Sequence, residues 1–381
     1  MTAGAAPFPP EIVPSSVQPL SEPARRSFWR QVGHDLIRAG GAQAGLGWIS
    51  ILVFAALFAP LLADTQPLLM KMDGHWSVPF LKYLSPTDWE LFVVADAIVL
   101  VTILRRAKPS IRWGIPLCLI VVAAVPIFAF VRVPLAIDWQ HTRDLERAGK
   151  VQWKLSAPIP YSPGDFLRDE PDMRLTPPSA QHWLGTDVNG ADVASRMLHA
   201  TRIALSIGLI STGISVIIGI TIGGLMGYFS GTVDILGMRL IEIFEAIPTL
   251  FLLITFVAFF GRNLYIMMAI IGLTGWTDEA RFIRAEFLRL RKQDFVQAAI
   301  AAGLPLPSIL FRHLLPNGIT PILVTSSFGI ASAILYESTL SFLGLGLVNE
   351  PSWGQMLNQA LSVGGTFTWW IAVFPGLAIF L

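Results

Sequence analysis

The sequence predicts an all-α membrane protein that crosses the bilayer several times. Its 381 residues are 53% hydrophobic and only 14% charged, whereas a soluble domain carries about 25% charged residues. The mean hydropathy is +0.60. Four stretches with little or no charge, 46–63, 113–131, 203–229 and 317–336, approach or exceed the roughly 20 residues that a spanning helix needs.

Four weaker stretches complete the predicted bundle. Residues 246–260 are short, but the span extends back through Leu240 if two glutamates are tolerated near a membrane face. Residues 89–104 contain two acids, residues 264–276 are few, and residues 366–381 run into the chain end as if truncated. We therefore predict about eight transmembrane helices.

Basic residues orient these spans. Loops rich in Lys and Arg stay in the cytoplasm, and short basic clusters occur at 25–38, 105–112 and 281–312. With eight spans, all three fall on one side, and the segment 338–366, which has no Lys or Arg, falls on the other. This pattern predicts a multi-pass protein of the cytoplasmic (inner) membrane with a cytoplasmic N-terminus.

The segment between two of these spans reads as helix–turn–helix. Asp294 can cap a helix over 295–300, and Gly303 sits where a helix-ending glycine belongs. Two prolines follow, and a second short helix is expected at 308–314. Its small alanines leave room for another protein's surface to close over it. An ordinary structured loop is the plainer alternative.

This segment resembles the EAA loop of ABC importer permeases, in the wording typical of the dipeptide/oligopeptide/nickel branch. The family pattern is E-A-A, three residues, Gly, nine residues and I-x-L-P; here Gln297 replaces the Glu and His313 replaces the Ile. The resemblance implies that this loop is a coupling helix that docks on an ATPase subunit. The implied coupling residues are Asp294, Gln297, Ala298, Ala299, Gly303, Arg312, His313, Leu315 and Pro316.

Two outer-side blocks resemble the same family. LGTDVNGADVASR, from Leu184, is similar to L-G-T-D-x-x-G-R-D-x-x-S-R, and YESTLSFLGLGLVNEPSWG, from Tyr336, is similar to E-S-x-L-S-F-L-G-L-G…P-x-W-G. The residues carried over are Gly185, Thr186, Asp187, Gly190, Asp192, Glu337, Ser338, Gly344, Gly346, Pro351, Trp353 and Gly354. Glu337 is expected to fix the re-entrant segment that follows it.

The resemblance implies the second, "C-type" permease of a heterodimer, whose last five spans form the type I importer core. It implies a second related permease, two cytoplasmic ABC ATPase subunits and an extracytoplasmic solute-binding protein as partners, with no nucleic acid. ATP and Mg would bind in the ATPase subunits, so this chain would bind no cofactor and would not be an enzyme. Transport by alternating access of small peptides, or of related solutes such as nickel complexes, is the implied function.

This comparison also divides the chain. We expect a cytoplasmic tail with an interfacial helix at 1–45, a first span at 46–64, an outer-side loop at 156–200 and a permease core at 201–381 with its coupling loop at 279–316. Residues 65–155 depart from the family and look like an insertion with a two-helix transmembrane hairpin. The role of that hairpin, the pore-lining residues, the transported compound and the pairing with an identical or a different permease stay open.

Other chemistry was weighed against structural roles. Glu242 and Glu245 suggest a proton relay in an ion-driven secondary transporter or channel, or else pair with arginine near the interface. His182, Asp187, Asp192 and His199 suggest a metal site, but their spacing does not fit the calcium-loop pattern, so loop-fixing is preferred and no metal is predicted. No G-x-x-x-x-G-K-[ST] or G-x-S-x-G motif occurs, which disfavours the further rival, a membrane-embedded enzyme. Glycines at 219, 223 and 227 predict close helix contact rather than a substrate path.

Overall fold

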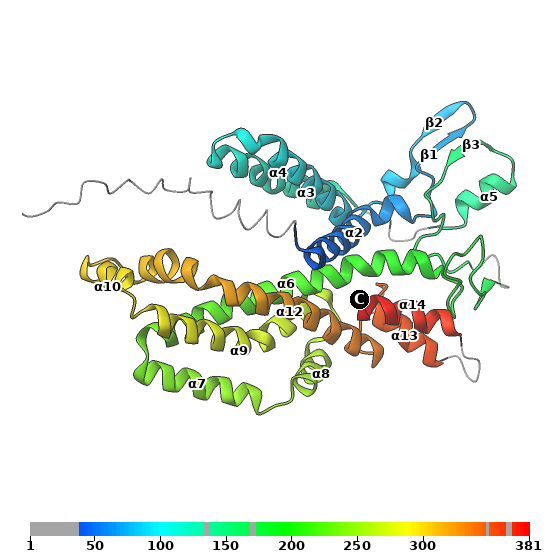
Figure 1. Cartoon of the computed structure of the whole chain (residues 1–381). Helices are drawn as coiled ribbons and strands as arrows, with labels where there is room; N and C mark the ends of the chain where they lie inside the picture. Colours follow the sequence, from blue (N-terminus) through cyan, green and yellow to red (C-terminus); the bar gives the residue numbers. More distant parts are fainter. Residues whose placement is uncertain (1–37, 133, 135–137, 168–172, 348–349, 363–367) are drawn as a thin grey trace, which may run out of the picture. The chain divides into compact units, whose positions relative to one another are not determined.

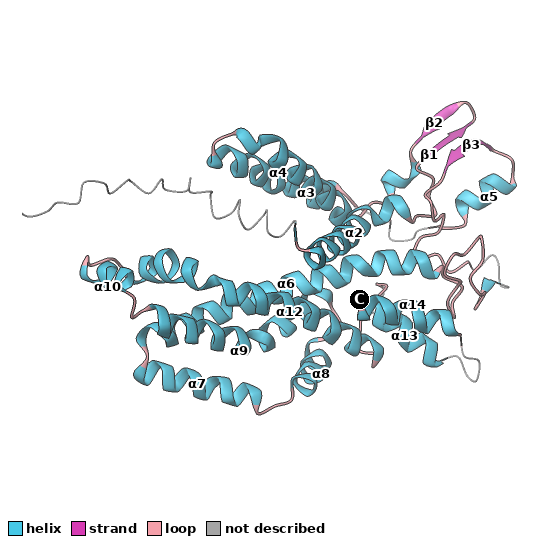
Figure 2. Cartoon of the chain, viewed as in Figure 1, coloured by secondary structure: helices cyan, strands magenta, loops and turns pink. Residues whose placement is uncertain are grey.

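The computed structural model is built mainly of long helices (Figures 1 and 2). It describes residues 38–132, 134, 138–167, 173–347, 350–362 and 368–381. The predicted interfacial helix at 27–38 therefore lies almost entirely outside the described residues. Two compact units divide at Ile51; the first contains the start of helix α2, and the second, Leu52–Leu381, contains the elements discussed below.

The elements follow one another along the chain with short connections. They are α2 (Gly40–Leu62), β1 (Leu69–Met72), β2 (His75–Ser77), α3 (Pro86–Ile103), α4 (Pro109–Phe130), α5 (His141–Arg147), β3 (Val151–Leu155), α6 (Val193–Phe229), α7 (Gly231–Glu245), α8 (Thr249–Phe260), α9 (Leu264–Leu290), α10 (Asp294–Ala301), α11 (Leu306–Ser308), α12 (Leu315–Phe342), α13 (Trp353–Ser362) and α14 (Trp369–Phe380). Short 3-10 turns occupy Pro79–Lys82 and Leu104–Arg106, and a π-helical turn occupies Ile309–Leu314.

Four helical runs among the described residues are long and apolar enough to cross a membrane. These are α2, α4, α6 and the continuous run Leu306–Phe342, and they contain the four strongest predicted spans. Helices α3, α9 and α14 occupy the weaker predicted spans, but each is too short or too charged to qualify by itself. The multi-span fold is confirmed, and the number eight stays a prediction.

The predicted span across 240–260 differs in the structure. It is two helices, α7 and α8, that meet at a 76° bend. Pro248 stands immediately before α8. Because proline has no N–H and disfavours helical geometry at the preceding residue, the chain turns there instead of continuing.

Helix α6 forms the centre of the bundle and packs along α9, with α12 against both (Figure 1). Gly219, Gly223 and Gly227 all face α9. A Cβ atom at any of them would lie under 3.0 Å from α9 atoms, including backbone atoms of Ala280 and Arg284. The glycine stripe therefore allows close helix contact within this chain, which confirms the packing prediction.

The inserted region contains the predicted pair of helices. Helices α3 and α4 lie side by side in Figure 1, and α4 exposes Leu117, Val121, Val125 and Phe128 at three- and four-residue spacing. An apolar helix face of this kind suits contact with lipid. The same region also holds a three-stranded antiparallel sheet, ordered β2-β1-β3, that the all-α prediction missed. Its strands have only three to five residues and no clear polar–apolar alternation, so the sequence carries little strand signal.

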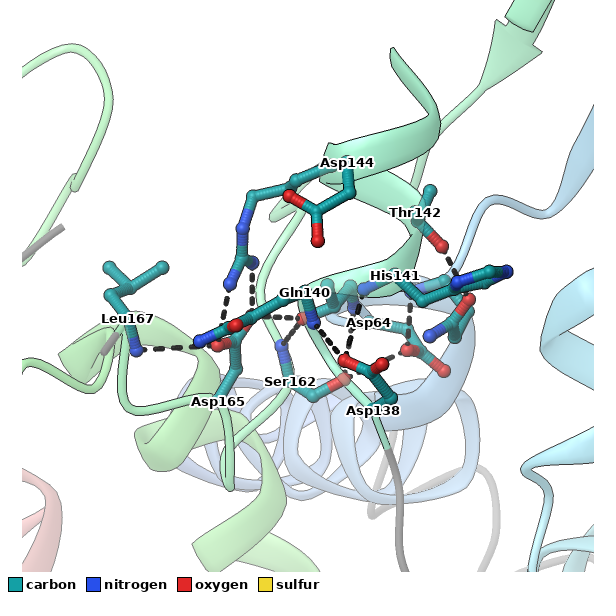
Figure 3. A network of polar contacts seen from close by, with 12 residues as sticks. Asp64, Asp138, Gln140, His141, Thr142, Asp144, Ser162, Asp165 and Leu167 are labelled. Atoms are coloured by element: carbon teal, nitrogen blue, oxygen red, sulfur yellow. Dashed lines mark hydrogen bonds and ion pairs between the residues drawn. The ribbon is translucent and has the colours of Figure 1, made fainter. Parts of the chain in front are cut away.

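A polar network ties this outer part to the end of α2 (Figure 3). Thr65 and Ser162 each donate a backbone N–H to the other's hydroxyl, at 2.9 and 2.8 Å, and the Ser162 hydroxyl donates to Asp64 Oδ1 at 2.8 Å. Arg143 of α5 donates to both carboxylate oxygens of Asp165, at 2.6 and 3.2 Å. The loop before the core is therefore a fixed structure.

Candidate functional site

The predicted coupling segment begins later than expected. Helix α9 continues to Leu290, so residues 279–290 are part of a long helix and not of a loop. Helix α10 then covers the predicted run, and Gly303 follows it with φ +70°, as predicted for a helix-ending glycine. Asp294 is not the cap: Gln293 holds that position without a side-chain bond, and Asp294 is the first helical residue. A carboxylate there still interacts favourably with the helix dipole.

Helix α10 has one buried face and one exposed face. Val296 and Ala299 are buried, while Phe295, Ile300 and, just beyond the helix, Leu304 are about 40% exposed. Small exposed residues, Ala298 and Ala301 to Gly303, lie beside them. This apolar surface on a basic segment matches what a partner protein would cover.

Gln297 takes part in the chain's own structure. Its Nε2 donates to the carbonyl of Arg291, at the end of α9, at 2.7 Å. Arg291 in turn donates to the Tyr228 carbonyl at 2.8 Å, at the end of α6. The residue that replaces the family's Glu thus joins α10 to the helices above it.

The predicted second short helix is not separate. Leu306–Phe342 is one continuous run, with a π-helical turn before Pro316. Because proline has no N–H to donate, a wider turn lets the helix pass it. Arg312 and His313 lie in this turn, and Leu315 and Pro316 open α12.

A buried cluster joins the coupling segment to the spans. Val296 of α10 packs with Leu310 and Leu314 of the π turn, with Phe287 of α9 and with Ile322 of α12. Movement of α10 is therefore passed directly to α9 and α12, since packed interiors transmit displacement rather than absorb it.

The two outer blocks, far apart in the sequence, meet in one structure. Arg196 donates to Asp187 Oδ2 at 2.9 Å and to Gln355 Oε1 at 3.0 Å. Asp187 Oδ1 accepts the backbone N–H groups of Asn189 and Ala191 at 2.8 and 2.9 Å. Both members of the Arg196–Asp187 pair are buried.

Further contacts involve the other predicted residues of these blocks. Trp353 Nε1 donates to the Met197 carbonyl at 3.3 Å, and Trp370 Nε1 donates to the Thr186 carbonyl at 3.1 Å. Asp192 caps α6 by accepting the Ser195 N–H at 2.8 Å. The glycines permit positive φ at 185, 190 and 344, and close approach to α12 at 346 and 354; Pro351 lies buried beside them.

Glu337 is buried near the end of α12. Its Oε1 accepts the Ser341 hydroxyl at 2.6 Å, and Ser338 lies 3.4 Å from its other oxygen. A Cβ at Gly354 would lie under 3.0 Å from the Ser338 backbone, so α13 begins against this point of α12. These contacts support the expectation that Glu337 helps to fix the segment after it.

The rival polar groups all have structural partners. His182 Nδ1 lies 2.8 Å from Asp192 Oδ2, and His199 Nδ1 lies 3.1 Å from the Ser195 carbonyl. The Glu242 carboxylate pairs with Arg239, and that of Glu245 pairs with Arg281. These pairings favour the structural readings over a metal site or a proton relay.

A cavity that sequence analysis did not find lies between α6, α9 and α12. Its volume is about 450 Å³, within the roughly 300–1,000 Å³ of ligand pockets. Its polar lining includes Ser211, Thr212 and Ser215 of α6, Asp278 and Glu279 of α9 and Thr325 of α12. A scatter of Ser and Thr over three helices forms no motif, so only the fold brings these residues together.

Comparison with known proteins agrees with this architecture. Residues 219–381 match the family of binding-protein-dependent transport system inner membrane components, and residues 27–86 match the N-terminal transmembrane domain of oligopeptide transport permease C. The inner membrane ABC transporter permease protein YejE of Escherichia coli is 34% identical over 344 residues, which is 88% of this chain and 89% of that protein. The peptidoglycan transport system permease protein YejE of Agrobacterium fabrum is 35% identical, covering 81% of this chain and 77% of that protein.

The dipeptide transport system permease protein DppC of Bacillus subtilis is 36% identical over a shorter stretch, covering 58% of this chain and 69% of that protein. The match to the Escherichia coli protein is too long to leave out residues 65–155, so at least part of the inserted region has a counterpart there. Together, the multi-span helical fold and these matches show that this chain belongs to the family of binding-protein-dependent transport system inner membrane components, the membrane permeases of ABC transporters.

Proposed function

We propose that this chain is one of two permease subunits of an ATP-driven importer that moves small peptides across the cytoplasmic membrane. Its proposed partners are a related permease, two cytoplasmic ABC ATPase subunits and an extracytoplasmic binding protein. ATP and Mg would be bound and hydrolysed in the ATPase subunits, and this chain would have no catalytic residue of its own. The N-terminus and α10 would face the cytoplasm.

The exposed apolar face of α10 is the observation that carries this proposal. The partner ATPase would cover Phe295, Ile300 and Leu304, and the cluster around Val296 would pass its movement to α9 and α12. Closure of the ATPase pair on ATP would then reorient the spans and alternate the access to the cavity between them.

Substitution of Gly303 tests the coupling role. Proline fixes φ near −65° and cannot adopt the +70° found here, so Gly303→Pro should displace α10. We expect the transporter to assemble and to hydrolyse ATP, but to import a labelled dipeptide much more slowly per ATP. Gly261→Pro is the matched control, since Gly261 has φ +88° and an equally open surrounding at the end of α8.

The outcome also separates the rival transport mechanism. Uptake that follows a proton gradient and ignores ATP would refute the importer. So would labelling that places Ala298 outside the cell. A Cys118→Ser background makes such labelling clean, because the chain has one cysteine.

Peptides derived from peptidoglycan are the second candidate cargo. The relative named for peptidoglycan transport covers 81% of this chain, whereas the dipeptide permeases cover 57–58%. Competition between a labelled dipeptide and a cell-wall tripeptide for uptake would decide between them.

A further inference from the structure

The cavity between α6, α9 and α12 contains polar atoms that the protein leaves without partners. Ser211 and Thr212 are 1% and 6% exposed, and neither hydroxyl has a hydrogen-bond partner in the described structure. Both residues line the cavity. Buried polar groups are normally satisfied, so two adjacent exceptions facing one cavity point to a ligand or to water.

A buried carboxylate faces the same space. Glu279 is 4% exposed, and the Thr325 hydroxyl lies 2.5 Å from its Oε2. Its other oxygen, Oε1, has no donor among the residues described. An ionisable group at membrane depth is by default a functional candidate.

Glu279 and Thr212 converge on one point. A Cβ built on Gly329 of α12 would lie 3.8 Å from Glu279 Oε1 and 3.5 Å from Thr212 Oγ1. The missing side chain of Gly329 therefore leaves a space between a carboxylate oxygen and an unpartnered hydroxyl. Ser211, on the neighbouring position of α6, lines the same cavity.

The charge of the lining selects the kind of ligand. Asp278 and Glu279 are acidic, and no lysine, arginine or histidine is among the described lining residues. A carboxylate oxygen with two hydroxyl oxygens offers three acceptors, and a primary ammonium carries three donors. The same lining repels a carboxylate.

We propose that this cavity is a relay site in the transport path that binds the protonated amino group of the cargo, through Glu279, Thr212 and Ser211. The inference rests on the proposed transport of peptides and names the end of the peptide that the permease recognises. Hydrogen bonds between an ammonium and a carboxylate are about twice as strong as neutral ones. Blocking the amine, or removing the charge of Glu279, should therefore abolish binding.

Cysteine protection in the assembled transporter tests this site without transport. Ser332 lines the cavity and is exposed, so Ser332→Cys in a Cys118→Ser background provides a single label. The probes are the dipeptide Ala-Ala and its N-acetylated form, added without ATP. We expect Ala-Ala to slow maleimide labelling, the acetylated form to have no effect, and Glu279→Gln to weaken protection by about tenfold or more in concentration.

Two further variants guard against a simple folding defect. Gly329→Ala adds a methyl group to the space and keeps the carboxylate, so it should also lose protection. Ser327→Ala is the control, because the Ser327 hydroxyl is exposed and bonded to its own helix at Leu323. That variant should be protected as the parent is.

Three results would overturn the site. They are equal protection by the two dipeptides, undiminished protection in both Glu279→Gln and Gly329→Ala, and protection by sodium ions alone at the same concentration. Because labelling needs no ATP, failure of the importer proposal is seen separately, as protection without ATP-driven uptake.

Discussion

The guanidinium of Arg196 lies 2.9 Å from the carboxylate of Asp187, and both groups are buried where the two outer blocks meet. Arg196 also donates to Gln355, which stands 159 residues later in the chain. One side chain thus joins the loop before α6 to the start of α13. Both blocks were noticed in the sequence, but their contact depends on the fold.

Breaking this pair should destabilise the outer side of the core. Removal of one partner from a buried ion pair costs about 3–5 kcal/mol, because the other charge is left buried. We expect Asp187→Asn to lower the thermal stability of the purified transporter and to reduce its amount in the membrane. A melting curve in detergent measures the change.

Lys154→Gln is the matched control for that substitution. Lys154 and Glu146 are 2.6 Å apart but largely solvent-exposed, with side chains 41% and 29% exposed. Such surface pairs contribute about 1 kcal/mol or less. If the two variants melt at the same temperature, the Arg196–Asp187 pair does not hold the outer blocks together.

The contact between α6 and α9 predicts a sharp difference between two glycines. At Gly223, an added Cβ would lie under 3.0 Å from Ala280 backbone atoms, whereas at Gly213 of the same helix no atom lies within 4 Å. Gly223→Ala should therefore force the helices apart and cost about 1–3 kcal/mol. Gly213→Ala should be neutral or slightly stabilising, since alanine has the higher helix propensity. Thermal unfolding of the two variants side by side tests this, and equal losses would contradict the packing.

Long apolar runs and short motifs account for what the sequence predicted well. The glycines at 219, 223 and 227, the helix around Gln297 and the turn at Gly303 each carry a local signal, and each lies where it was expected. The bend before Pro248 and the continuous run through Pro316 were missed, because proline stops a helix or is passed according to the packing around it. The cavity was beyond reach, since Thr212, Glu279 and Gly329 meet only through tertiary packing.

The bond from Gln297 to the end of α9 predicts a cost for restoring the family's residue. Gln297 donates its amide N–H to the Arg291 carbonyl, and an ionised glutamate has no proton to donate. We expect Gln297→Glu to lose about 1 kcal/mol locally and to speed hydrogen exchange in α10. Gln293→Glu is the control, because the Gln293 side chain makes no capping bond. Unchanged exchange in Gln297→Glu would mean that the bond does not hold α10.

The network at the end of α2 predicts a response to pH on the outer side. Burial raises the pKa of Asp64 to about 6, although the Gln66 N–H and the Ser162 hydroxyl partly offset this. The nearby Asp88 carboxylate acts in the same direction as burial. The folded state therefore prefers protonated Asp64, while the unfolded chain releases that proton near the ordinary value of 3.8.

The sign of the effect follows from proton linkage. Between about pH 4 and pH 6 the folded state binds more protons than the unfolded state, so stability falls as the pH rises. The contribution is complete below pH 4 and is lost above pH 6, and it amounts to at most about 3 kcal/mol. Hydrogen exchange of residues 138–167, followed from pH 4 to 7 and corrected for the intrinsic exchange rate, should show faster opening at the higher pH. Asp64→Asn should remove this dependence, while Asp144→Asn, at a carboxylate that is 63% exposed, should leave it in place. A pH response that persists in Asp64→Asn would assign it to another group.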